Sequence, residues 1–143
     1  MSKFQNKFRV ESNRLKGLDY TEPLWYYVTI CTKNHQRFFG KVTNGIMRLS
    51  DIGKIVHEEW VKTKSIRKNV ELDEFIIMPN HIHGIIIINT VETTGSVVSK
   101  NNNEMTHRVI FTTLQKNSLG SIIGQFKSVC TKIIRKNNHP NFA

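Results

Sequence analysis

Apolar positions in the N-terminal part of the chain follow the two-residue period of strands. Residues 25–32 are rich in aromatic and β-branched side chains and come after Pro23, which predicts a strand. Turn-forming residues fill the stretch 34–45, and 45–49 have the pattern of a short return strand. The N-terminal part of the chain is therefore expected to form β-strands.

Two later segments repeat apolar positions at intervals of three and four residues, which is the period of a helix. The first helix is expected to be capped by Ser50 or Asp51 and to run to about Lys64. The second is expected to be capped by Ser118 and to run to about Lys136, with a basic outer face. Each helix thus has one apolar face available for packing.

Two apolar runs between these helices are separated by a tight turn. Residues 71–78 and 81–89 predict two antiparallel strands that are joined at Pro79 and Asn80, since proline cannot donate a ladder hydrogen bond. The isoleucines at 85–88 are typical of a central strand that is buried on both faces.

This order of elements predicts an α+β fold. We expect a ferredoxin-like antiparallel sheet that has its helices on one face and lacks its final strand. The polar stretch at 90–117 is interpreted as a long insertion or loop. No repeat or linker divides the sequence, so residues 1–143 are expected to form a single domain.

The charge of the chain indicates a polyanionic partner. Its 143 residues include 21 Lys and Arg against 11 Asp and Glu, which gives a formal net charge of +10. The residues that we expect to contact DNA lie in the N-terminal arm and the last helix: Arg14, Lys16, Lys127, Lys132, Arg135 and Lys136. Binding through phosphates should weaken steeply with salt. Trp25, Tyr26 and Tyr27 either stack on unpaired bases or belong to the core.

Cysteine and hydropathy patterns limit the cellular setting. Cys31 and Cys130 are far apart and lack metal-ligand spacing. The sequence shows neither a signal peptide nor an apolar stretch of membrane-spanning length. We therefore expect a cytoplasmic chain with reduced thiols and no membrane partner.

The residues that most clearly indicate chemistry are His81 and His83, which flank Ile82 at the start of a predicted strand. Successive side chains of a strand point to opposite faces, so both imidazoles should share one face, about 6 to 7 Å apart. Two such rings can hold one cation and leave open positions for a substrate phosphate. The alternative is a pair of structural histidines. Asn80 beside them is either a turn former or a group that orients the first ring.

The segment 78–84, Met-Pro-Asn-His-Ile-His-Gly, resembles the signature of the HUH single-tyrosine transposases, in particular the REP-associated tyrosine transposases. Segments 14–20, 27–34, 70–75 and 118–128 resemble the same subgroup in the same order. The resemblance implies a nuclease and ligase of single-stranded DNA, in which the histidine pair holds Mg or Mn and a tyrosine attacks the phosphate. Imidazole ligands alone would suit zinc as well.

The chain departs from this family at the nucleophile. Tyr20, Tyr26 and Tyr27 all precede the histidine pair, whereas the resemblance places the catalytic tyrosine on a later helix that also carries the third metal ligand. We therefore expect the tyrosine nucleophile and its helix beyond Ala143, and a C-terminally truncated domain that binds DNA without cutting it. Cys130 is an alternative nucleophile or a half-buried structural thiol.

The resemblance implies hairpin-flanked single-stranded DNA as the partner. A homodimer is expected rather than a monomer, because the unpaired edge of an incomplete sheet seeks a partner. Two other functional classes stay open. One is a non-catalytic nucleic-acid-binding domain. The other is a small-molecule metallohydrolase, for which only His107 and His139 follow the pair as further ligands.

Overall fold

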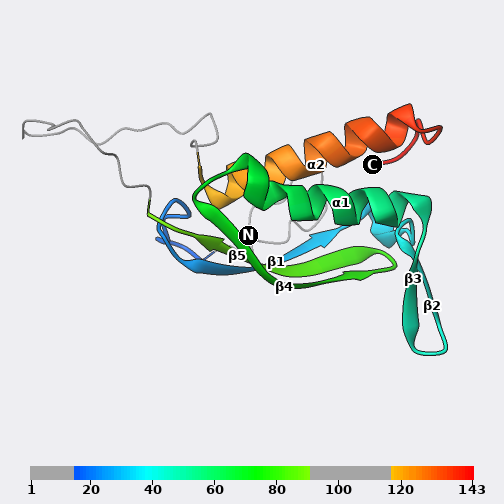
Figure 1. Cartoon of the computed structure of the whole chain (residues 1–143), viewed down its shortest axis with the longest axis horizontal. Coiled ribbons are helices and arrows are strands. Elements are labelled where there is room, and N and C mark those ends of the chain that lie inside the picture. Colours follow the sequence, from blue (N-terminus) through cyan, green and yellow to red (C-terminus); the bar gives the residue numbers. More distant parts are fainter. Residues whose placement is uncertain (1–14, 91–116) are drawn as a thin grey trace, which may run out of the picture.

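The computed structural model describes residues 15–90 and 117–143, so Arg14 and nearly all of the predicted 90–117 loop lie outside the described residues. The elements in chain order are β1 (Trp25–Cys31), a 3-10 turn (Lys33–His35), β2 (Gly40–Thr43), β3 (Ile46–Leu49), α1 (Asp51–Ile66), β4 (Val70–Met78), β5 (His81–Ile88) and α2 (Leu119–Lys136) (Figure 1). Among these residues, no helix combines the length and the apolarity that are needed to cross a membrane.

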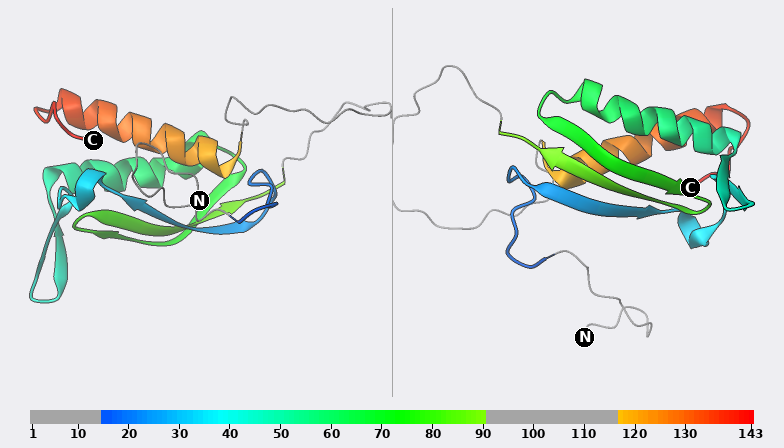
Figure 2. Two further views of the ribbon diagram at one scale, coloured as in Figure 1. Left: turned by 180° about the vertical axis from the view of Figure 1, so that it is seen from behind. Right: turned by 60° about the horizontal axis from the view of Figure 1, so that its bottom comes forward.

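Three strands form the main sheet in the order β1-β5-β4, and both neighbouring pairs are antiparallel. β1 and β4 therefore run parallel, and the chain passes between them through α1, as in a split β-α-β unit. The two helices lie side by side and cover one face of this sheet, while the other face is open (Figure 2). The predicted α+β fold, with an antiparallel sheet and its helices on one face, is confirmed.

The stretch between β1 and α1 differs from the prediction. Residues 40–43, which were assigned to a turn, form β2 and pair with β3 in a separate hairpin. Asn44 and Gly45 connect the two strands with positive φ angles of 51° and 75°. An Asn-Gly pair in this conformation forms the tight hairpin turn whose twist matches that of its strands.

Both predicted helix starts are confirmed by their caps. The Ser50 hydroxyl oxygen accepts a hydrogen bond from the Gly53 amide at 3.0 Å. The Ser118 hydroxyl oxygen accepts one from the Ser121 amide at 3.1 Å. Each cap satisfies one of the backbone N–H groups that a helix leaves unpaired in its first turn.

The hydrophobic core lies between the sheet and the two helices. Its largest fully buried side chains are Trp60 of α1, Ile82 and Ile86 of β5, and Ile122 and Ile134 of α2. Residues of β5 alternate between buried and partly buried, so only one face of this strand is covered. The prediction of burial on both faces was wrong, since helices pack on a single side of the sheet.

A glycine in β5 makes room for the largest core side chain. A Cβ atom at Gly84 would lie 2.5 Å from Cζ2 of Trp60 and 3.3 Å from Cβ of Phe75. The Trp60 ring therefore packs directly on the backbone of β5. Opposite this point, the register between β4 and β5 shifts between Leu72 and Phe75. The shift inserts one extra residue into β4, which lets both Leu72 and Phe75 pack against the core.

Candidate metal centre on the open face of the sheet

His81 and His83 begin β5 and project from the face of the sheet that the helices leave open. Ile82 between them is 1% exposed in the core, whereas both histidines are partly exposed. The centroids of the two imidazole rings lie 4.6 Å apart, with ring planes at 79°. The structure thus places the two predicted ligands on one face, as the two-residue period indicated, but the rings lean toward each other and are closer than the expected 6 to 7 Å.

Asn80 holds the first imidazole in one orientation. Its Oδ1 lies 2.7 Å from Nδ1 of His81, and its Nδ2 donates to the backbone carbonyl of His35 at 3.2 Å. The contact with the His35 carbonyl identifies Nδ2 of the amide, so Oδ1 is the end that faces the ring. Because this oxygen can only accept, Nδ1–H of His81 is the donor. The lone pair of the neutral ring is then on Nε2, where a metal ligand needs it. Asn80 therefore forms the turn and also orients His81.

The second imidazole is held by two hydroxyl groups of β1. Nδ1 of His83 lies 2.8 Å from the Tyr27 hydroxyl and 2.9 Å from the Thr29 hydroxyl. The Tyr27 and His83 rings are also stacked, with centroids 5.6 Å apart and planes at 18°. When Nδ1 of His83 donates to these oxygens, Nε2 is left as the free ligand atom, as in His81.

Sequence reasoning missed Tyr27 and Thr29 as partners of His83. Thr29 is the direct register partner of His83, and Tyr27 lies one pair further along the same face. The alternation within β1 placed both residues on one face, but their relation to His83 depends on the pairing of β1 with β5.

The donor set consists of two imidazoles. Across residues 15–90 and 117–143, no three His, Cys, Asp or Glu side chains come together in a way that could hold a metal ion. Cys31 is the register partner of His81, yet it completes no such group. Two imidazoles leave the other coordination positions of an ion to water or a bound ligand, and imidazole ligands alone would suit zinc or manganese.

The pKa of His81 is lowered from the ordinary histidine value of 6.5, mainly because partial burial disfavours the charged ring. The nearby rings of His83 and His35 add positive charge that lowers it further. His81 is therefore expected to be neutral at pH 7, with its Nε2 lone pair available to a cation.

We expect an NMR pH titration of the metal-free protein to give a midpoint for His81 below the value that the same residue shows in denaturing urea. His35→Ala should raise this midpoint, because it removes one neighbouring cationic ring. A His81 midpoint at or above that of the unfolded chain would contradict the geometry described here.

The predicted basic DNA contacts lie apart from the histidine pair. Lys127, Lys132, Arg135 and Lys136 are exposed on α2, in the helical layer behind the sheet. Lys16 is exposed in the segment that leads into β1. The structure thus leaves these side chains accessible to a polyanion, but it does not bring the α2 residues to the open face.

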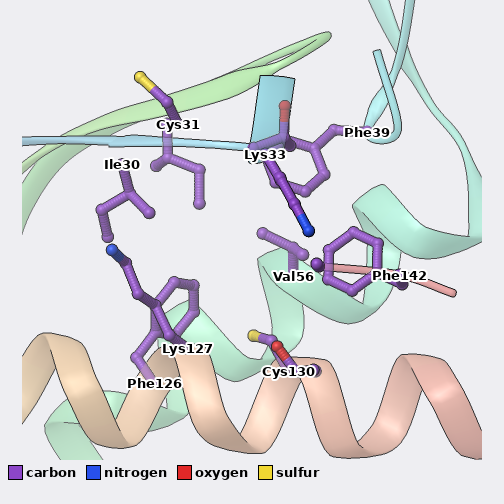
Figure 3. A pocket seen from close by; sticks show the side chains of 13 residues that line it. Ile30, Cys31, Lys33, Phe39, Val56, Phe126, Lys127, Cys130 and Phe142 are labelled. Carbon is purple, nitrogen blue, oxygen red and sulfur yellow. The ribbon is translucent and has the colours of Figure 1, made fainter. Parts of the chain in front are cut away.

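A cavity of about 300 Å³ lies between β1, α2 and the C-terminal residues, on the helical side of the sheet (Figure 3). Cys130 lines it together with Phe126 and Phe142, and its side chain is 4% exposed. Burial raises the pKa of this thiol to about 12, so it stays protonated at neutral pH. Cys130 is therefore a buried structural thiol that lies away from the histidine pair.

Fold and site together define an α+β domain with two oriented imidazoles on an open sheet face. No protein-family model matches the chain, and no solved structure matches it. It is 37% identical over 129 residues to an uncharacterized protein of Haemophilus influenzae (strain ATCC 51907 / DSM 11121 / KW20 / Rd). The match covers 89% of this chain and 69% of that protein. The chain therefore belongs to the same family as the Haemophilus influenzae protein.

Proposed function

We propose that this chain is a domain of the HUH tyrosine transposase type, which binds single-stranded DNA on the open face of its sheet. His81 and His83 would hold Mg²⁺ or Mn²⁺ there, with a phosphate of the DNA supplying further ligands. The sequence motifs around the histidine pair support this assignment, as do the charge of +10 and the exposed position of the pair.

The observation that carries the proposal is the way the two imidazoles are held. Each ring has its Nδ1 atom engaged by a neighbouring side chain, Asn80 for His81 and the hydroxyls of Tyr27 and Thr29 for His83. Histidines that ligate a metal characteristically have their second nitrogen fixed in this way. Among the described residues, neither Nε2 atom has a hydrogen-bond partner, so both are available to a cation.

A bound divalent ion would stabilise the negative charge that develops on the non-bridging oxygens of a phosphate during displacement. The residues of the chain contribute the geometry: Asn80 and Thr29 set the ring orientations, and the face of the sheet that carries both rings is open to a DNA strand. The Tyr27 hydroxyl is directed at Nδ1 of His83, so we assign Tyr27 to the orientation of that ring. DNA nicking and joining by a tyrosine remains part of the proposal through the family resemblance.

The proposal predicts that metal and DNA bind cooperatively. An oligothymidylate should raise the affinity for Mn²⁺, measured by electron paramagnetic resonance, because its phosphates supply oxygen ligands that residues 15–90 and 117–143 do not add to the histidine pair. Linkage requires Mn²⁺ to strengthen DNA binding by the same factor. The DNA affinity should also fall linearly with salt on a double-logarithmic plot.

The controls separate the proposal from its alternatives. His83→Ala should remove the coupling between Mn²⁺ and DNA but leave salt-dependent DNA binding in place. DNA binding that is the same with and without Mn²⁺ in the wild-type chain would favour a non-catalytic nucleic-acid-binding domain. The absence of DNA binding at low salt would show that the proposal is wrong.

A further inference from the structure

Two large aromatic side chains are exposed on the same face as the histidine pair. Trp25 and Tyr27 of β1 are 69% and 68% exposed, whereas Tyr26 between them is 5% exposed and belongs to the core. A tryptophan left in water on a sheet face gains its free energy of burial only when a ligand covers it. We infer that Trp25 and Tyr27 form a stacking site for one unpaired base of the single-stranded DNA whose phosphate reaches His81 and His83. This inference rests on the proposed function.

The spacing of the two side chains suits a single base. Residues i and i+2 of a strand lie about 6.8 Å apart on one face. Stacked rings are separated by about 3.5 Å, so a gap of this size admits one planar ring between two others. The strand geometry therefore offers a slot one base thick between Trp25 and Tyr27.

The two rings differ in how firmly they are held. Tyr27 is tied by its hydroxyl to Nδ1 of His83 and stacks on the His83 ring. In the described part of the chain, no other ring contacts Trp25. Tyr27 can thus form a fixed wall of the slot, and the exposed ring of Trp25 can form the other wall.

The side of the slot that faces β5 is apolar. Ile87 is the register partner of Trp25, and Ile85 is that of Tyr27, and both are partly exposed on the open face. A base inserted edge-on between the aromatic rings would cover these isoleucine side chains. Its burial adds to the stacking interaction without reading the sequence, because every base has a π-face.

Charge indicates the side on which the DNA backbone runs. β4, on the far side of β5, carries three exposed acidic residues: Glu71, Asp73 and Glu74. Described β1 residues carry no acidic side chain. Because phosphates avoid carboxylates, the backbone should follow β1, with its bases turned toward the sheet.

The chain contains two tryptophans, and Trp60 is 1% exposed, so a quencher in solution reports mainly on Trp25. We expect an oligothymidylate to quench this emission and to protect it from iodide. An abasic oligonucleotide of the same length carries the same charge without bases, and it should leave the emission unchanged.

Variants measure the contribution of each ring to binding. Trp25→Ala and Tyr27→Ala should each weaken oligothymidylate binding by about 5- to 150-fold. Trp25→Ala should bind the abasic oligonucleotide as the wild type does, and Tyr27→Ala should do so when no Mn²⁺ is present, because Tyr27 also orients His83. Tyr27→Phe keeps the ring and should retain the stacking affinity. Ile66→Ala, which removes an apolar side chain that is 54% exposed on α1, is the matched control and should bind both oligonucleotides normally.

Four results would overturn the stacking site. The first is that the wild type binds DNA without quenching of Trp25 and that Trp25→Ala binds DNA equally well. This result would leave the proposed function intact. The second is Trp25 emission that changes with protein concentration alone, because a second copy would then cover this face. The third is that Trp25→Ala weakens the binding of the abasic and the normal oligonucleotide by the same factor. The fourth is stronger binding and quenching with oligouridylate, which would reassign the ligand to RNA.

Discussion

Replacing both His81 and His83 by alanine is expected to abolish Mn²⁺ binding, and each single replacement to weaken it by at least about 100-fold. Among the described residues no third His, Cys, Asp or Glu completes a metal-binding group with the two imidazoles, so each imidazole should contribute a large share of the affinity. Loss of an outer-shell partner alone typically lowers metal affinity about 10- to 100-fold, and loss of a ligand should exceed that. Isothermal titration calorimetry in the presence of an oligothymidylate measures the effect.

His139→Ala is the matched control, because it removes an exposed histidine that belongs neither to the pair nor to its hydrogen-bonding neighbours. It should bind Mn²⁺ as the wild type does. Circular dichroism should show that the two single variants and the double variant keep the fold, since His81 and His83 project from the open face and their replacement leaves the core unchanged. Equal Mn²⁺ affinity in the wild type, the single variants and the double variant would refute the metal site.

The largest effect on stability is expected from Trp60→Ala, which should lower the free energy of unfolding by about 3–5 kcal/mol. The Trp60 ring is 1% exposed and packs against Phe75, Phe126 and the backbone of Gly84. Removing it leaves a cavity at the centre of the contact between α1 and the sheet. Urea unfolding followed by circular dichroism gives the value without relying on tryptophan emission.

Gly84→Ala tests the same contact from the sheet side. Its new methyl group would lie 2.5 Å from the Trp60 ring, so we expect a loss of about 1–3 kcal/mol in the wild-type background. In the Trp60→Ala background the loss should be much smaller, because the clashing ring is gone. Ile66→Ala is the surface control and should change stability by no more than about 0.5 kcal/mol. Additive losses for the Gly84 and Trp60 changes would contradict the packing.

Sequence periodicity predicted the helices, the three strands of the main sheet and the face on which the histidines lie. These features depend on local patterns: Ser50 and Ser118 are cap residues, and alternation around Ile82 sends both histidines to one side. β2 was missed because four residues that begin with glycine give too short a pattern, although Asn44 and Gly45 signal a hairpin turn.

The surroundings of His83 could not be predicted in the same way. Thr29 and Tyr27 reach it only because β1 and β5 pair in one register, across more than fifty positions of the chain. A shift of one residue would have turned His83 toward different neighbours. Likewise, the charges of Lys127 and Arg135 were evident from the sequence, whereas their location behind the sheet followed from the packing of α2.

Among the described strands, β1 pairs only with β5, so one side of its backbone carries no ladder partner. Strands bound along a single side open more readily than central ones, and this local opening has its own free energy. Tyr27 and Thr29 belong to β1, whereas both imidazoles belong to the central strand, β5. The orientation of His83 is therefore thermodynamically coupled to the fraying of β1. Any strand that docks on the free side of β1 would suppress that fraying and hold His83 more rigidly, although it would not contact either imidazole.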